Sequence, residues 1–270
     1  MTPTEFKTKD VDIRRCARPR KMGSGKEAVL GLHGYMGYPG ELVYPAQQLA
    51  DAGFTVSLPR FPGHGTCGED FNNSNGGQWL RAAVDAYLEL KTDHEKVHLM
   101  GHSMGGILSI ILASMFPVEK MVLMAPAVKI KGPLLLAEPL SLFVNKAMNR
   151  PPWKSDPSIQ FFDDRDEDDD QYLGQEYWTW SYFKRLADLS RLRRRSVRAL
   201  PAVQAETLTI MGSKDPTVDP AAASVIEKRA GGRTETVFLE NSAHLVPYEK
   251  DYKKNAELTV SWMLPSAFNK

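Results

Sequence analysis

The chain has 270 residues, of which 42% are hydrophobic and 25% are charged. This composition predicts a globular domain with a substantial core and argues against a disordered or fibrous chain. The formal net charge is +1, so no global field would gather nucleic acid or hold the chain on an anionic membrane. We therefore expect the partner to be a small molecule and not nucleic acid.

Targeting and membrane-spanning segments are not evident in the sequence. The first ten residues are partly charged and lack the apolar stretch of a signal peptide. No later segment approaches the roughly 20 uninterrupted apolar residues of a membrane span. We expect a soluble, cytoplasmic protein without stable membrane insertion, whose two cysteines, Cys16 and Cys67, are free thiols.

Strand-like and helix-like stretches alternate along most of the chain. Loose alternation over residues 10–16 and the apolar run 28–32, separated by a Gly-Ser-Gly turn, predict an antiparallel hairpin. The further expected strands are 54–58, 96–100, 120–124, 207–211 and 234–239, and the expected helices are 41–52, 79–90, 105–116, 218–230 and 252–264. Several strands are continuously apolar, as in parallel strands covered on both faces. This order predicts an α/β fold with a mostly parallel, doubly wound sheet and helices on both faces.

A long segment interrupts the alternation between the strands at 120–124 and 207–211. Its roughly 80 residues far exceed the usual connection of a few residues, so we expect an insertion at about 127–203 in a single domain spanning 1–270. Its apolar and aromatic residues favour a helical cap over a pocket; the alternative is a helical excursion that buries them against itself. Its acidic and basic runs lack metal-site spacing and are typical of solvated loops.

The sequence GHSMG at residues 101–105 fits the pattern G-x-S-x-G. A predicted strand precedes it and a predicted helix follows it, which is the context in which the serine stands on a sharp, strained turn with its hydroxyl exposed. The flanking glycines remove side chains that would clash at that turn. We therefore predict Ser103 to be a nucleophile.

A serine hydroxyl needs a neighbouring base, and in this topology an acid and then a histidine follow the serine along the chain. Asp215 follows the strand 207–211, and His244 follows the strand 234–239, so both should reach the sheet edge that carries Ser103. His244 is the only histidine after the serine motif. Asp219 is the alternative acid, but Pro220 behind it favours a helix cap.

The loop HGYMG at residues 33–37 follows the first core strand. An acyl-transfer intermediate needs two fixed donors for its oxyanion, and the backbone N–H groups of Met104 and Tyr35 are the candidates. We expect His33 to hold this loop through hydrogen bonds. For binding of the substrate, we expect His64 to fix its loop and line the entrance, and Leu135 and Phe143 of the insertion to line an acyl pocket.

Five motifs in chain order, HGYMG, LPRFPGHG, GHSMGG, GSKDPTVDP and NSAHLVPYEK, resemble the bacterial carboxylesterase and monoacylglycerol lipase branch of the α/β hydrolases. The resemblance covers the core on both sides of the insertion. It implies an α/β-hydrolase fold with a cap, the triad Ser103, Asp215 and His244, and an oxyanion hole formed by the N–H groups of Tyr35 and Met104.

The expected activity is hydrolysis of carboxylic esters with short to medium acyl chains through an acyl-enzyme intermediate. No metal or organic cofactor is implied, because side chains and backbone N–H groups fill every chemical role. Monoacylglycerol lipase, thioesterase, perhydrolase, C–C hydrolase and acyltransferase activities would keep the same triad and stay open. The serine argues against haloalkane dehalogenases, which carry an aspartate there. A catalytically silent binding scaffold would typically lack a triad member, and none is missing.

Overall fold

The computed structural model describes residues 11–132, 136–149, 154 and 167–264. Its main sheet has seven strands in the order β1-β3-β2-β4-β5-β8-β9. The strands are β1 Arg20–Met22, β2 Ala28–Leu32, β3 Thr55–Leu58, β4 Val97–His102, β5 Lys120–Met124, β8 Glu206–Gly212 and β9 Thr234–Leu239. All neighbouring pairs are parallel except β1 and β3. The predicted mostly parallel, doubly wound sheet is therefore confirmed.

The predicted N-terminal hairpin is wrong. Residues 11–14 form no strand, and Arg15–Ala17 is a short 3-10 helix. The strand β1 pairs antiparallel with β3, with Arg20 opposite Leu58, and not with β2. Both edges of β2 are already occupied by the parallel strands β3 and β4, so the N-terminal segment pairs instead with the outer edge of β3.

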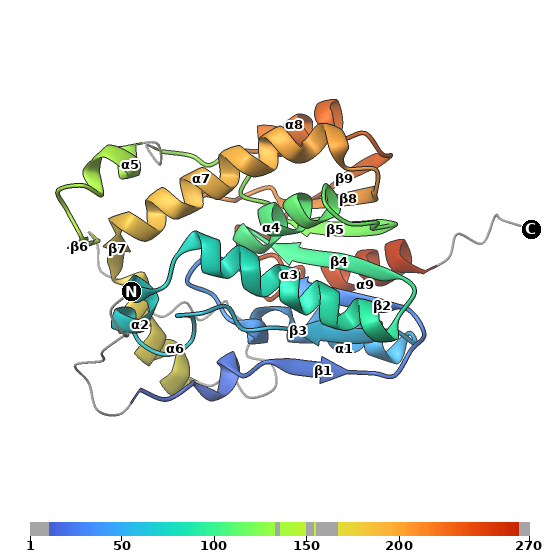
Figure 1. Ribbon diagram of the computed structural model, residues 1–270, viewed down its shortest axis with the longest axis horizontal. Coiled ribbons are helices and arrows are strands. Elements are labelled where there is room, and N and C mark those ends of the chain that lie inside the picture. Colours follow the sequence, from blue (N-terminus) through green and yellow to red (C-terminus); the bar gives the residue numbers. More distant parts are fainter. Residues whose placement is uncertain (1–10, 133–135, 150–153, 155–166, 265–270) are drawn as a thin grey trace, which may run out of the picture.

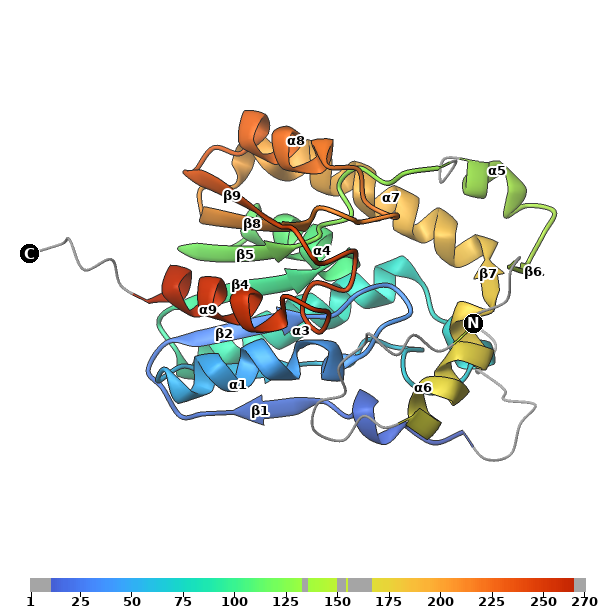
Figure 2. The ribbon, with the colours of Figure 1, turned by 180° about the vertical axis from the view of Figure 1, so that it is seen from behind.

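Helices cover both faces of the sheet (Figures 1 and 2). They are α1 Val43–Asp51, α2 Gly68–Asn73, α3 Gly76–Asp93, α4 Met104–Ala113, α8 Ala221–Arg229 and α9 Tyr252–Met263. One apolar cluster joins α3, α4 and α8 to one face of the sheet, and a second joins α1 and α9 to the other. Every residue of α4 is buried, as its almost continuously apolar sequence predicts. None of the helices in the described ranges has the length and apolar character needed to cross a membrane.

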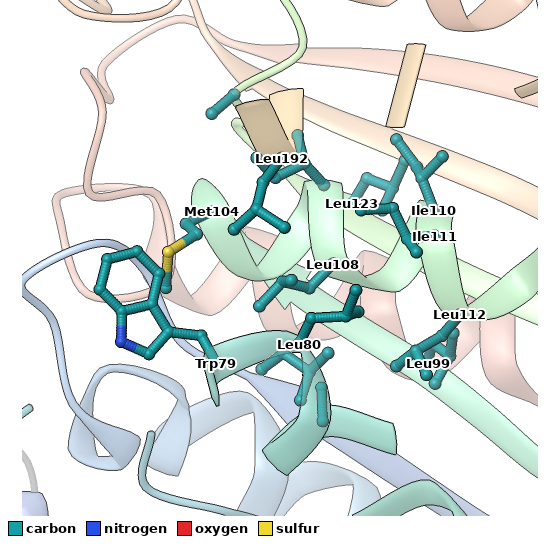
Figure 3. Packing of buried hydrophobic residues seen from close by; sticks show 14 of the residues in the cluster. Trp79, Leu80, Leu99, Met104, Leu108, Ile110, Ile111, Leu112, Leu123 and Leu192 are labelled. Carbon is teal, nitrogen blue, oxygen red and sulfur yellow. The ribbon is translucent and has the colours of Figure 1, made fainter. Parts of the chain in front are cut away.

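The segment between β5 and β8 combines two kinds of structure. Its described elements are α5 Ala137–Leu140, β6 Lys146–Met148, α6 Glu167–Leu173, a π-helix at Gly174–Trp178, β7 Trp180–Tyr182, α7 Phe183–Ala199 and a 3-10 helix at Leu200–Ala202. The long helix α7 packs on α3 and α4, and Figure 3 shows Leu192 of α7 beside Leu108 of α4. It is thus the crossover helix of the core between β5 and β8. The elements α5, β6, α6, the π-helix and β7, with the antiparallel β6–β7 pair among them, lie beyond one end of the sheet (Figure 1).

Candidate active site

The turn at Ser103 joins β4 directly to α4. Ser103 has φ 52°, a left-handed conformation that is strained for a residue with a side chain. The two motif glycines let the backbones close around it: a Cβ on Gly101 would lie 2.5 Å from the Gly105 carbonyl oxygen, and a Cβ on Gly105 would lie 1.8 Å from that of Leu32. The Ser103 N–H donates to the Met124 carbonyl at 2.9 Å, which ties the strained turn to β5.

The three predicted triad residues meet at the carboxyl ends of their strands. His244 Nε2 lies 3.0 Å from Ser103 Oγ, and His244 Nδ1 lies 2.8 Å from Asp215 Oδ2. The other carboxylate oxygen of Asp215 accepts the N–H groups of Thr217 and Val218 at 2.7 and 2.9 Å. Burial alone would raise the pKa of Asp215, but the hydrogen bond and charge of His244, together with these N–H groups, lower it. Asp215 is thereby kept as a carboxylate facing the imidazole.

Asp219, the alternative acid, faces other groups. One of its oxygens accepts the N–H of Ala221 at 2.8 Å at the start of α8, and the other lies 3.1 Å from Lys129 Nζ. The N–H of Ala221 and the Lys129 side chain lower the pKa of Asp219. This geometry is that of a helix cap with an ion pair, and it leaves Asp215 as the acid beside His244.

The backbone amide of Tyr35 is held in one orientation. The Gly34 carbonyl accepts hydrogen bonds from His33 Nδ1 at 3.0 Å and from the Gly37 N–H at 3.1 Å. Because the peptide unit is planar and trans, fixing the Gly34 carbonyl points the Tyr35 N–H the opposite way. Within the described ranges, neither this N–H nor that of Met104 donates a hydrogen bond. In this part of the chain, neither predicted oxyanion donor is thus occupied by a protein acceptor.

His33 uses both ring nitrogens to hold this loop. Its Nδ1 donates to the Gly34 carbonyl, and its Nε2 accepts the N–H of Phe61 at 3.2 Å. Burial, and then nearby positive groups, lower the pKa of His33 well below its usual range. A neutral, fully bonded imidazole agrees with the expected holding function.

The three residues expected to bind substrate differ in their surroundings and in whether the structure describes them. His64 is fully buried: Nδ1 donates to the Pro62 carbonyl at 3.1 Å, and burial lowers its pKa to about 3. The hydrogen bond ties the ring to its own loop, and the ring has no exposed surface. Phe143 is 86% exposed, and in the described part of the chain no hydrogen bond or ring contact joins its side chain to the triad. Leu135 lies outside the described residues.

Three groups near the site were missed from the sequence. Glu41 and His102 are both buried, and Glu41 Oε2 accepts the Gly34 N–H at 3.1 Å. Trp178 of the π-helix donates from Nε1 to the carbonyl of Met36 at 3.2 Å, so the insertion touches the loop that carries Tyr35. Glu41 stands at the start of a predicted helix, His102 occupies a variable position of G-x-S-x-G, and Trp178 is one of several aromatic residues in the insertion. None of these positions signals the contacts.

A serine, an imidazole and a carboxylate joined in series are the groups that nucleophilic acyl transfer requires. Within the described ranges, no group of three or more His, Cys, Asp or Glu side chains is placed to hold a metal ion.

The sheet order, the strained serine turn and the functional loops at the strand ends define an α/β-hydrolase fold. A family model described as "Alpha/beta hydrolase family" matches residues 29–257, which is most of the chain. The protein therefore belongs to the α/β-hydrolase family, and the resemblance inferred from its five motifs is confirmed.

Known relatives cover part of the chain. A thermostable monoacylglycerol lipase from Bacillus sp. (strain H-257) is 37% identical over 101 residues, covering 37% of this chain and 40% of the lipase. A carboxylesterase from Bacillus subtilis (strain 168) is 29% identical over 116 residues, covering 43% of this chain and 47% of the esterase. The chain thus matches less than half of either relative's length.

Solved structures match almost the whole chain. One, from work on the metagenome-derived lipolytic enzymes LipS and LipT, has a TM-score of 0.80 at 22% identity and covers 93% of this chain and 98% of that one. The monoacylglycerol lipase of Paleococcus ferrophilus has a TM-score of 0.69 at 19% identity, covering 90% of this chain and 98% of that one. At these identities the likeness shows the fold alone.

Proposed function

We propose that this protein hydrolyses carboxylic esters through an acyl-enzyme intermediate on Ser103. The observation that carries the proposal is the hydrogen-bonded series from Ser103 Oγ through His244 to Asp215. His244 takes the hydroxyl proton on Nε2 as Oγ attacks the ester carbonyl carbon. Asp215 holds the ring with its proton on Nδ1 and stabilises the imidazolium that forms.

The remaining steps use the same groups. Attack places a negative charge on the former carbonyl oxygen, which the N–H groups of Tyr35 and Met104 stabilise. His244 then protonates the departing alkoxide oxygen, the C–O bond breaks, and the acyl group stays on Ser103. Water attacks the acyl carbon as His244 takes its proton, and collapse releases the carboxylic acid while that proton returns to Ser103 Oγ. The proposed cycle needs no cofactor.

We propose esters with short to medium acyl chains as the preferred substrates. Ser103 is only 8% exposed. Two buried, apolar side chains stand next to the reacting groups in the sequence: Met104 follows Ser103, and Met36 follows Tyr35. Such surroundings favour uncharged, apolar acyl groups. A monoacylglycerol is the second candidate because the lipase relative is 37% identical over 101 residues. Thioester hydrolysis and perhydrolysis would use the same triad.

We propose further that the insertion, residues 127–203, caps the site within one domain spanning 1–270. Two contacts support this proposal. Tyr177 of the insertion accepts the Thr66 N–H at 2.8 Å and donates to the Gly63 carbonyl at 3.1 Å, both in a loop after β3. Trp178 reaches the Met36 carbonyl in the loop after β2.

The test is a panel of p-nitrophenyl esters from acetate to laurate, run beside monoacylglycerols, acyl-CoA thioesters and an amide. We expect the highest kcat/KM on a short- or medium-chain ester, and a fluorophosphonate probe should label Ser103. Thioester turnover far above that of every ester would replace the proposed substrate class. Absence of both turnover and labelling would contradict a catalytic function altogether.

A further inference from the structure

A second histidine–carboxylate pair lies buried directly behind the nucleophile. His102, the residue before Ser103, is 2% exposed, and Glu41 is 5% exposed. His102 Nδ1 lies 3.3 Å from Glu41 Oε2. Burying a carboxylate costs free energy unless hydrogen bonds compensate for the lost hydration, so the partners of this pair show what it holds in place.

The partners of His102 determine where its protons lie. His102 Nε2 is 2.9 Å from the backbone carbonyl of His244, and a carbonyl oxygen can only accept, so Nε2 carries a proton. The other ring nitrogen faces the Glu41 carboxylate, so a proton must also lie between Nδ1 and Oε2. Burial would lower the pKa of His102, but the hydrogen bond and charge of Glu41 outweigh it, and the pKa is raised. With Nδ1 held by Glu41, His102 donates a hydrogen bond from Nε2 to the backbone carbonyl of His244.

Glu41 also shapes the loop that carries the Tyr35 N–H. Its Oε2 accepts the Gly34 N–H at 3.1 Å, one peptide before the proposed oxyanion donor. The loop closes over the carboxylate so tightly that a Cβ on Gly37 would lie 2.2 Å from Glu41 Oε1. Met36, between these two glycines, has φ 57°, so the loop is strained and needs such an anchor.

We propose that Glu41 and His102 are positioning residues that hold the loop of Tyr35 and the loop of His244 in register with Ser103. The inference rests on the proposed function of the triad, because it assigns the pair no chemistry of its own. Without the pair, the Gly34 peptide and the His244 backbone would each lose a charge-assisted anchor. Both losses would displace groups that act on the transition state, namely the Tyr35 N–H and the His244 imidazole.

The chain supplies a matched control on the same strand. At the opposite end of β4, His98 Nε2 lies 3.0 Å from Glu27 Oε2, and His98 is also 2% exposed. This pair joins the same two residue types, but the Glu27 side chain is 35% exposed and also lies 3.6 Å from Lys96 Nζ. It lies at the amino end of the strand, away from the triad. Its loss measures what a histidine–carboxylate pair on this strand contributes to stability without a connection to the triad.

The experiment compares Glu41→Gln and His102→Asn with Glu27→Gln, using the best p-nitrophenyl ester and counting active sites by burst titration. We expect kcat per titrated site to fall about 10- to 100-fold in the first two variants, since misplacement by about 1 Å can cost ~100-fold. KM should stay within about threefold, because the Tyr35 N–H and the His244 imidazole contribute more to the transition state than to binding of the ground-state ester. The double variant should lose no more than the worse single variant, and Glu27→Gln should keep kcat within about twofold.

Equal loss of kcat in Glu27→Gln and Glu41→Gln, or a loss confined to thermal stability, would overturn the positioning proposal. If the wild type turns over none of the esters, the proposed function fails, yet the rate of fluorophosphonate labelling of Ser103 still tests the pair. If the variants do not fold, ¹⁵N NMR of the wild type decides: His102 must carry a proton on Nε2 at neutral pH, and an unprotonated Nε2 would refute the proposal.

Discussion

The catalytic edge of the sheet and the insertion are held in place in different ways. At the edge, Ser103, Asp215 and His244 each follow a strand of one parallel sheet, so the pairing of β4, β5, β8 and β9 sets their separation. The outer part of the insertion instead reaches the core loops through single side chains, among them Tyr177 and Trp178.

This difference predicts two scales of response to substitution. A ladder of backbone hydrogen bonds forms cooperatively, so changing one triad side chain removes a chemical group while the scaffold stays in place. A single side-chain hydrogen bond contributes only about 1 kcal/mol, so its loss shifts geometry modestly. Edge substitutions should therefore abolish chemistry, and insertion substitutions should tune it.

The largest expected effect is that of Ser103→Ala. The substitution removes the attacking oxygen and almost no volume, so ester turnover should fall by about a thousandfold or more while the melting temperature stays near that of the wild type. Steady-state kinetics and thermal unfolding measured on the same preparation check both halves. Retention of more than about a tenth of wild-type activity on every ester would remove Ser103 as the nucleophile.

Next in size is the contrast between Asp215→Asn and Asp219→Asn. Asp215 faces His244 Nδ1 at 2.8 Å, whereas Asp219 caps α8, so the first substitution should lower kcat by roughly 10³- to 10⁴-fold and the second by less than about threefold. Asp219→Asn should appear mainly as a small loss of stability, because a helix cap contributes about 1 kcal/mol. Equal losses of kcat would undo the assignment of the acid.

The same contrast explains what the sequence could predict. Continuous apolar runs and the order of serine, acid and histidine after successive strands were enough to identify most of the sheet and to bring Ser103, Asp215 and His244 to one edge. The prediction of an N-terminal hairpin was wrong because an alternating pattern does not show which strand has an unpaired edge. Both edges of β2 are paired, with β3 and with β4.

Side-chain contacts between distant segments were beyond sequence reasoning. Glu41 lies 61 residues from His102, and Trp178 lies 142 residues from Met36. No local pattern signals either pair, because each depends on where two loops meet in space. The sequence also did not single out α7 as the core helix that connects β5 to β8. The whole segment between these strands departs from the alternation of strands and helices, so its core helix could not be told apart from the rest of the insertion.

A smaller effect is expected for Trp178→Phe. The substitution keeps an aromatic ring but removes the N–H that binds the Met36 carbonyl, so the strained loop of Tyr35 loses one anchor. We expect kcat to fall about three- to tenfold with KM within about twofold. The control is Trp180→Phe on β7, whose ring lies 4.3 Å from Lys146 Nζ. Equal changes of kcat and KM in the two variants would show that the Trp178 hydrogen bond does not help to position the proposed oxyanion donor of Tyr35.

The attachment of α5 to α7 should depend on pH. The hydrogen bond from Arg194 lowers the pKa of Glu138 from 4.5 to about 2, so the ion pair stabilises the fold above about pH 4.5 and is lost as the pH falls toward 2. Because the pair is partly exposed, Glu138→Gln should lower the melting temperature by less than about 3 °C at pH 7. That difference should shrink on acidification, and a difference that grows would contradict the assignment.

The smallest expected effect concerns Phe143 and decides how far the substrate pocket extends into the insertion. A residue that lined the pocket would bury its ring, and each methylene of an acyl chain packed against it would gain about 0.8 kcal/mol. Phe143 is instead 86% exposed. Phe143→Ser should therefore change the ratio of kcat/KM for long and short p-nitrophenyl esters by less than about twofold, with acetate hydrolysis unchanged.

The comparison is Met36→Ser, which changes a buried apolar residue on the loop of Tyr35 and should lower turnover of every ester. A shift of several-fold confined to long chains in Phe143→Ser would show that this part of the insertion closes over the acyl group during turnover, and would extend the substrate site from the sheet edge onto the insertion.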